Sequence, residues 1–265
     1  MKAADAMRAT GTMKAAGALR AEWTKFASIR ATVVLSGAAV AVSGLLAWLF
    51  GSAATRDYTE ATAAERLRFD PMDPAMRGVF IVQLLVAGLG ALIASSEYGS
   101  GTIAASVAAV GRRRLVAAKA GMTVLSALPV SVAAIWLMFG VSMATMASHG
   151  VPTLGAGDPA ALITLLVGPL VLTSLALVGL SLGLLARGTA AAVNISTALL
   201  LLPVFATVSP GWLRNVIGVY WPNTAAFRAL SADPDLPRLL GLGILAGFTA
   251  VLLGVAFARF ESRDV

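Results

Sequence analysis

The stretch of sequence that decides the fold is GVFIVQLLVAGLGALIASS, residues 78–96. It contains no charged side chain, and Gln83 is its only amide. An α-helix needs about 20 mostly apolar residues to cross the hydrocarbon core of a bilayer. The stretch shows no strand-like alternation, and a backbone in lipid must satisfy its own hydrogen bonds, as a helix does. We therefore predict a membrane-spanning helix here.

Similar apolar runs recur along the chain, at about 31–50, 120–147, 160–186, 190–208 and 239–258. The 265 residues are 58% hydrophobic and only 12% charged, too apolar for a soluble domain to cover its own surface. The predicted fold class is therefore all-α, a polytopic membrane protein with six transmembrane helices. Three spans contain a proline that either kinks the helix or is tolerated as a bend: Pro129, Pro169 and Pro203.

The distribution of basic residues predicts the orientation. If the N-terminus is cytosolic, 13 of the 20 Lys and Arg fall in the cytosolic segments 1–30, 97–119, 187–189 and 259–265. Lys and Arg favour the cytosolic side of a membrane, so both termini are expected there. The same rule accounts for the net charge of +7 without a nucleic-acid partner.

The chain divides into three predicted parts: a basic cytosolic segment 1–30, a six-helix transmembrane domain 31–258 and a cytosolic tail 259–265. In the first part, the 4-then-3 spacing of Leu19, Trp23 and Phe26 puts them on one helical face. This pattern predicts an amphipathic helix on the cytosolic interface, with a simple basic anchor as the alternative.

The two longest outer segments differ in character. Residues 51–77 are polar, and YTEATAAERLRFDP predicts a short surface helix stopped by Pro71. Residues 209–238 carry aromatics among isolated polar residues and are too interrupted to span. They predict one or two short re-entrant or interfacial helices, anchored by Trp212, Tyr220, Trp221 and Phe227.

The connection between the second and third spans, EYGSGTIAASVAAVGRRRLVAAKA (97–120), is unusual in an otherwise apolar sequence. Two close glycines allow a sharp turn, and Thr102 is placed to cap a short helix. That helix ends at Gly111, and its 4-then-3 spacing aligns Ile103, Val107 and Val110. We predict a short helix parallel to the membrane that offers an apolar ridge to a cytosolic partner. The alternative is a loop whose arginines only fix topology.

The chain lacks the residues of several other functions. It has no cysteine and one histidine, His149, which leaves no disulfide and no thiolate or histidine metal centre. No Gly-Lys pair occurs, so no phosphate-binding loop of that kind is present. The spans contain no ionisable relay, which argues against a proton-driven carrier. Close helix contact is permitted by two pairs, Gly179/Gly183 and Gly243/Gly247, in a chain with 26 glycines.

Three segments resemble the ABC transporter permeases of the type-2 exporter family, in particular small actinobacterial members. The connection 97–120 resembles their cytosolic loop, with matches at Glu97, Tyr98, Gly101, Thr102, Ile103 and Lys119. AEWTKFASIRAT (21–32) resembles the segment before their first span, with matches at Glu22, Trp23, Lys25, Arg30 and Thr32. YWPNTAAFRAL (220–230) resembles their outer segment before the sixth span.

The resemblance implies a permease domain in the plasma (inner cytoplasmic) membrane. It implies a second, identical or related permease as partner, surrounding lipid, and an ATP-binding subunit that carries ATP and Mg, so this chain has no cofactor and no catalytic residue. The short helix would be a coupling helix, with ATPase-coupling residues Glu97, Tyr98, Gly99, Gly101, Thr102, Ile103, Val107, Arg112, Arg113 and Arg114. Interfacial support would come from Glu22, Trp23, Lys25 and Phe26.

Two functions follow as hypotheses. The first is a permease subunit of an ATP-driven exporter, whose apolar spans suit a hydrophobic or amphiphilic compound, although lipid-facing packing explains the same composition. The second is a stand-alone membrane carrier or a membrane scaffold or regulatory protein that needs no ATPase.

Overall fold

The computed structural model describes residues 17, 22–24, 26, 28–99, 101–231 and 236–262. The regular structure in these residues is entirely helical, which confirms the predicted all-α class. The elements are α2 (Arg30–Glu60), α3 (Ala63–Arg66), α4 (Met72–Met76), α5 (Val79–Gly99), α6 (Ile103–Val110), α7 (Arg112–Ala147), α8 (Pro159–Ala186), α9 (Thr189–Leu201), the 3₁₀ helix η1 (Leu202–Val208), α10 (Gly211–Val219), α11 (Pro222–Leu230) and α12 (Arg238–Ser262).

Six of the helical segments in the described part are long and apolar enough to cross a membrane. They are α2, α4 with α5, α7, α8, α9 with the start of η1, and α12, and they correspond in order to the six predicted spans. The chain therefore has the character of a multi-pass membrane protein.

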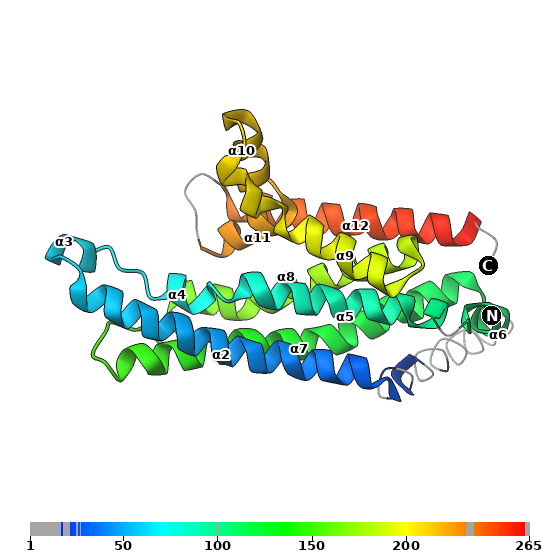
Figure 1. The fold of residues 1–265 in the computed structure, drawn as a ribbon, viewed down its shortest axis with the longest axis horizontal. Coiled ribbons are helices and arrows are strands. Elements are labelled where there is room, and N and C mark those ends of the chain that lie inside the picture. Colours follow the sequence, from blue (N-terminus) through cyan, green and yellow to red (C-terminus); the bar gives the residue numbers. More distant parts are fainter. Residues whose placement is uncertain are drawn as a thin grey trace, which may run out of the picture.

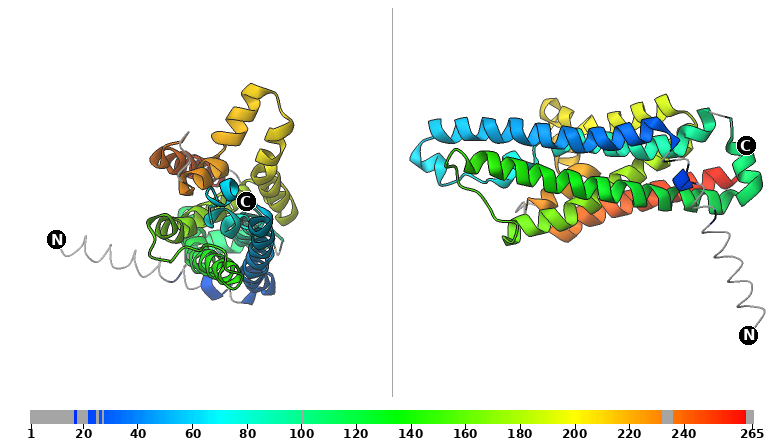
Figure 2. Two further views of the ribbon diagram at one scale, coloured as in Figure 1. Left: turned by 90° about the vertical axis from the view of Figure 1, so that its left-hand side faces the viewer. Right: turned by 90° about the horizontal axis from the view of Figure 1, so that it is seen from below.

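The spans form a bundle with α5 and α8 at its centre. These two are the most buried spans and pack most extensively against each other, whereas α2, α9 and α12 are the most exposed. The start of α2, α6 and the end of α12 lie at one end of the bundle, and α3 lies at the other (Figure 1). The short helix α10 projects sideways from the bundle (Figure 1, and Figure 2, left).

Several helices extend beyond the apolar runs that predicted them. Helix α2 continues to Glu60, α7 begins already at Arg112, and α12 ends at Ser262, inside the predicted tail. The physical reason is that apolar composition marks the lipid-facing part of a helix, while the helix itself continues until a residue stops it. At the start of α7 that residue is Gly111.

Residues 51–77 contain more helices than predicted, whereas 209–238 contain the number expected. In 51–77 the short surface helix is α3, which ends before Pro71 and carries a capping box between Thr62 and Glu65, and α4 follows it. In 209–238 the two short helices expected are α10 and α11. Pro129 and Pro169 lie inside continuous α-helices, while at Pro203 the chain has already changed from α to 3₁₀ geometry.

Glycines bring α5 and α8 into backbone contact. A Cβ atom on Gly179 would lie 1.9 Å from the carbonyl oxygen of Ala87, and one on Gly90 would lie 1.8 Å from that of Ala176. Gly183 approaches Ala94 and Ala91 in the same way. Of the two predicted small-residue pairs, Gly179 and Gly183 thus both form a close contact with α5. Gly243 and Gly247 form none, because a Cβ atom added at either glycine would meet nothing within 4 Å.

We expect Gly179→Ala to destabilise the bundle, because its methyl group would overlap a backbone oxygen that cannot rotate away. The loss should be about 1–3 kcal/mol, the usual range for overpacking. The matched control is Gly247→Ala, in an exposed part of α12, which should leave stability unchanged or raise it slightly through helix propensity. Unfolding in mixed detergent micelles with increasing dodecyl sulfate, followed by circular dichroism, measures both. Equal stabilities of the two variants would contradict the close contact.

Candidate functional site

The turn between α5 and α6 is closed by two backbone hydrogen bonds. The Gly101 amide donates to the Tyr98 carbonyl (3.3 Å), and the Thr102 amide donates to the Glu97 carbonyl (3.1 Å). With a φ of +68° at Gly101, these bonds form a Schellman motif that ends α5. Gly99 is instead the last helical residue of α5, with open space around it. The predicted sharp turn therefore requires glycine at only one of the two positions.

Helix α6 is also bounded by glycine at its other end. Gly111 has φ +84° and ψ 149°, a region that only glycine adopts without strain, and its amide donates to the Val107 carbonyl. The predicted helix end is thus confirmed. Thr102 stands at the N-cap position, as predicted, but its side chain makes no capping hydrogen bond to α6. Its backbone is already helical, whereas a capping residue is normally extended.

The apolar ridge of α6 faces the protein itself. Ile103 is buried and Val107 and Val110 are half-buried, while alanines occupy the exposed face at 104, 105, 108 and 109. Ile103 and Val107 pack into a cluster with residues of α5, α7, α8 and α12: Leu89, Ile93, Leu115, Val116, Leu184 and Phe260. The ridge was expected to be offered to a partner. Ile103 and Val107 instead pack on the chain's own core and Val110 is half-buried, so α6 presents its alanine face outward.

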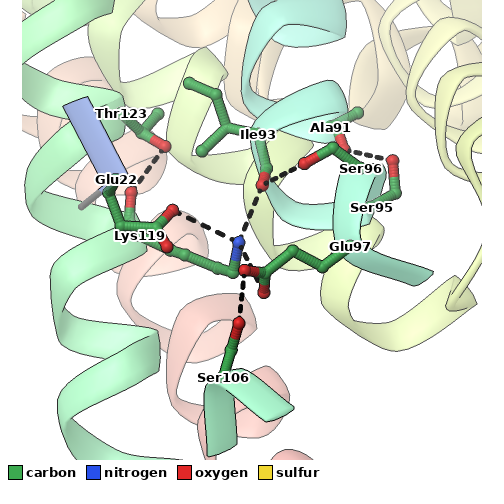
Figure 3. A network of polar contacts seen from close by, with 9 residues as sticks. All are labelled: Glu22, Ala91, Ile93, Ser95, Ser96, Glu97, Ser106, Lys119 and Thr123. Carbon is green, nitrogen blue, oxygen red and sulfur yellow. Dashed lines mark hydrogen bonds and ion pairs between the residues drawn. The ribbon is translucent and has the colours of Figure 1, made fainter. Parts of the chain in front are cut away.

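A buried ion cluster lies behind α6. The Lys119 ammonium on α7 is 3.2 Å from a carboxylate oxygen of Glu97 and 3.3 Å from one of Glu22. It also donates to the Ile93 carbonyl on α5 at 3.1 Å. Ser106 on α6 donates to the other carboxylate oxygen of Glu97 at 2.8 Å. Figure 3 shows these side chains converging from the N-terminal segment, α5, α6 and α7.

The three charged side chains are almost fully removed from solvent. Lys119 is 1% exposed, Glu97 3% and Glu22 4%. A charge with so little contact with water is tolerated only when it is paired and hydrogen-bonded. Two carboxylates share one ammonium here, and the Ser106 hydroxyl gives Glu97 a further donor. The cluster thus holds the N-terminal segment, α5, α6 and α7 in one arrangement.

The arginines that follow α6 join two helix ends. Arg112 donates to the Glu261 carbonyl on α12 at 2.9 Å, and Arg113 forms an ion pair with the Glu261 carboxylate. Arg114 is exposed. Two of the three arginines predicted as ATPase-coupling residues therefore tie the start of α7 to the end of α12, a role that neither predicted alternative included.

The described residues before α2 support the same end of the bundle. Trp23 and Phe26 lie side by side, with ring centroids 6.1 Å apart, as their spacing predicted. The Thr32 hydroxyl oxygen lies 2.6 Å from the Phe26 carbonyl oxygen and 2.7 Å from that of Ile29, so its single hydrogen is shared between them where the chain turns into α2. Of the predicted support residues, Lys25 lies outside the described residues, as does most of the segment 1–30.

Sequence reasoning missed the central role of Lys119. Its place at the edge of an apolar run is typical of a basic residue that sets topology. A signal was present, because Leu115, Lys119, Met122 and Ser126 follow the 4-3-4 spacing of one helical face. All four are buried, so this is the inner face of α7. A lysine on such a face predicts a buried acidic partner, although it does not identify the partner.

The ion cluster joins α5, α6, α7 and the segment before α2 through side-chain contacts. Among the described residues, no group of three or more His, Cys, Asp or Glu is placed to hold a metal ion.

Comparison of the chain with protein-family models, with curated proteins and with solved structures found no significant match. The likeness to exporter permeases is thus carried by the residues quoted above, and the family stays a prediction.

We expect Lys119→Met to destabilise the protein strongly, by about 3–5 kcal/mol, because two carboxylates would remain buried without their cation. Glu22→Gln should cost far less, since Lys119 keeps Glu97 and the cluster becomes neutral. The control is Lys119→Met combined with Glu22→Gln and Glu97→Gln, which removes every charge and should recover much of the loss. Detergent unfolding compares the variants. If Lys119→Met were no worse than Glu22→Gln, the cluster would not hold these segments together.

Proposed function

We propose that this chain is a membrane-spanning permease subunit of an ATP-driven ABC exporter. It would form the translocation path with a second permease, identical or related, and would receive energy from a separate ATP-binding subunit on which ATP and Mg reside. The side of the membrane that carries α6 is the cytosol in this proposal, in agreement with the excess of Lys and Arg at 1–30 and 97–119.

The observation that carries the proposal is the attachment of α6 to the ion cluster. A glycine bounds α6 at each end, at 101 and 111, and its Ser106 hydroxyl is hydrogen-bonded to Glu97. Glu97 lies in the last turn of α5 and pairs with Lys119, two turns after the start of α7. A force applied to α6 would therefore reach two spans through an ion pair and a hydrogen bond. This is the arrangement that a coupling helix requires.

The outward face of α6 suits a protein partner. Its four alanines leave a smooth surface on which another protein can approach the helix backbone closely. A groove on an ATPase subunit could therefore enclose α6 without displacing its inner face, which is occupied by Ile103 and Val107. The exposed apolar faces of α2, α9 and α12 leave room for lipid and for a second permease.

Partner binding should be lost when the alanine face is made bulky. We expect Ala105→Arg to abolish recovery of an ATP-binding subunit in a mild-detergent pull-down of the tagged chain from its native membranes. Ala64→Arg is the matched control, because Ala64 is an exposed alanine on the short helix α3 at the opposite end of the bundle. Mass spectrometry identifies the bound proteins. Recovery of the chain alone, under conditions that preserve other membrane complexes, would favour the stand-alone carrier or scaffold.

Coupling should be lost when the turn before α6 is strained. Gly101→Val places a β-branched residue at φ +68°, at a cost of about 1–2 kcal/mol, and should shift α6 relative to Glu97. We expect ATP hydrolysis to continue while transport falls, as also for Glu97→Ala. Gly99→Ala, at a helical position with open space, should couple normally. Transport and hydrolysis are measured together in proteoliposomes that contain the ATPase partner. Normal transport by Gly101→Val and Glu97→Ala would refute the coupling role of α6.

A further inference from the structure

A cavity of about 340 Å³ lies between α4, α5, α7, α8, α11 and the start of α12. It is toward the end of the bundle opposite α6, where Figure 1 shows α4 and α11. The volume is within the range of small-molecule sites. The function proposed above does not use this cavity.

Most of the cavity wall is apolar. Val79 and Ile135 on it are almost fully buried, and Phe80 faces Phe227 with ring centroids 5.9 Å apart. The apolar side chains of the lining are Met72, Met76, Val79, Phe80, Ile135, Phe227 and Leu230. Methionine side chains are flexible, so such a wall adapts to apolar bodies of different shape. This part of the cavity therefore suits the apolar portion of a ligand.

The charged residues of the lining lie where the spans begin. Asp70, Asp73 and Arg77 precede α5, and Arg238 is the first residue of α12. All four are exposed, whereas the buried part of the wall comes from within the spans. A ligand with a polar head and an apolar body would therefore place its head at these charges and its body between the helices.

Two of these charges neutralise each other, and two do not. Asp73 and Arg77 form an ion pair with 2.5 Å between nitrogen and oxygen. Asp70 accepts a hydrogen bond from the Met72 amide but forms no ion pair with any residue that the structure describes. Arg238 likewise forms none within the described part of the chain. One carboxylate and one guanidinium thus remain for the head of a ligand.

We propose that this cavity binds a zwitterionic amphiphile, with one positive and one negative group on its head. A head with only a positive charge would be repelled by Arg238, and one with only a negative charge by Asp70. The hydroxyls of the lining, on Thr164 and Ser231, already donate to carbonyls of their own chain segments. The inference holds whether or not an ATPase partner exists, so its outcome is separate from that of the proposed function.

The test uses photoreactive probes that share a dodecyl chain ending in a diazirine. Their head groups are phosphocholine, trimethylammonium and methyl phosphate. The full chain in dodecyl maltoside is illuminated with each probe, and mass spectrometry locates the labelled residues. With the phosphocholine probe, labelling of the cavity should saturate as its concentration rises. Labelling of exposed apolar residues on α2, Trp48 and Leu49, should instead rise in proportion, because they only contact the detergent.

A variant that fills the cavity checks the location. Ala160 is exposed and lines the cavity, so Ala160→Trp should abolish the saturable labelling. The matched control is Ala156→Trp, in the segment before α8 and outside the lining, which should leave it unchanged. Labelling that does not saturate in the unaltered chain would overturn the proposal. So would saturable labelling that persists in an Ala160→Trp chain with normal helix content by circular dichroism.

The head groups check the two charges. The phosphocholine probe should label the cavity about threefold better than either other probe, a ratio typical of one exposed ion pair. Arg238→Gln should remove its advantage over trimethylammonium. Asp70→Asn, which can still accept the amide hydrogen bond, should remove its advantage over methyl phosphate. The controls Arg56→Gln and Asp57→Asn, both exposed and outside the lining, should preserve both advantages. Equal labelling by all probes in the unaltered chain would overturn the zwitterionic assignment, as would variants that change all probes alike.

Discussion

The end of the bundle that carries α6 is organised around one buried cation. The Lys119 ammonium has almost no contact with solvent, so it must find negative charge within the protein, and Glu22 and Glu97 supply it from two other segments. This requirement fixes how the N-terminal segment, α5 and α7 meet. It also fixes α6, because Ser106 is hydrogen-bonded to one of the two carboxylates. Neighbouring apolar residues then exclude water from the cluster.

The two kinds of contact between spans differ in what they permit. Where α5 meets α8, glycines bring the two backbones into contact. Such a contact allows only one relative position of the two helices. At the α6 end, α5 meets α7 through charges, whose attraction falls gradually with distance and which can exchange partners. The contact between α5 and α8 therefore tolerates less displacement of its two spans than the contact between α5 and α7.

The transmembrane architecture was predictable because a single strong constraint sets it. The run 78–96 and its five counterparts are apolar over the thickness of a bilayer, and no other structure satisfies their backbones. Helix ends were less predictable, since α2 and α7 continue past the apolar runs until a stop residue is reached. The sequence does not predict that the apolar face of α6 turns inward, because such a face packs on the chain's own core as readily as on a partner. The pairing of Lys119 with Glu22 and Glu97 joins residues that are far apart in the sequence. Local sequence patterns therefore do not predict it.

The length of α7 has a mechanical consequence. The helix runs without a break from Arg112 to Ala147, and Pro129 stands at its midpoint. Its length is about 54 Å at 1.5 Å per residue, well over the hydrocarbon thickness of a bilayer. A rigid tilt of about 10° about the midpoint would move each end by about 5 Å in opposite directions. Proline lacks the amide that would complete the backbone bond at this point, so the helix bends there most easily. Helix α7 can therefore tilt as one body or bend at Pro129, and the two movements displace its ends differently.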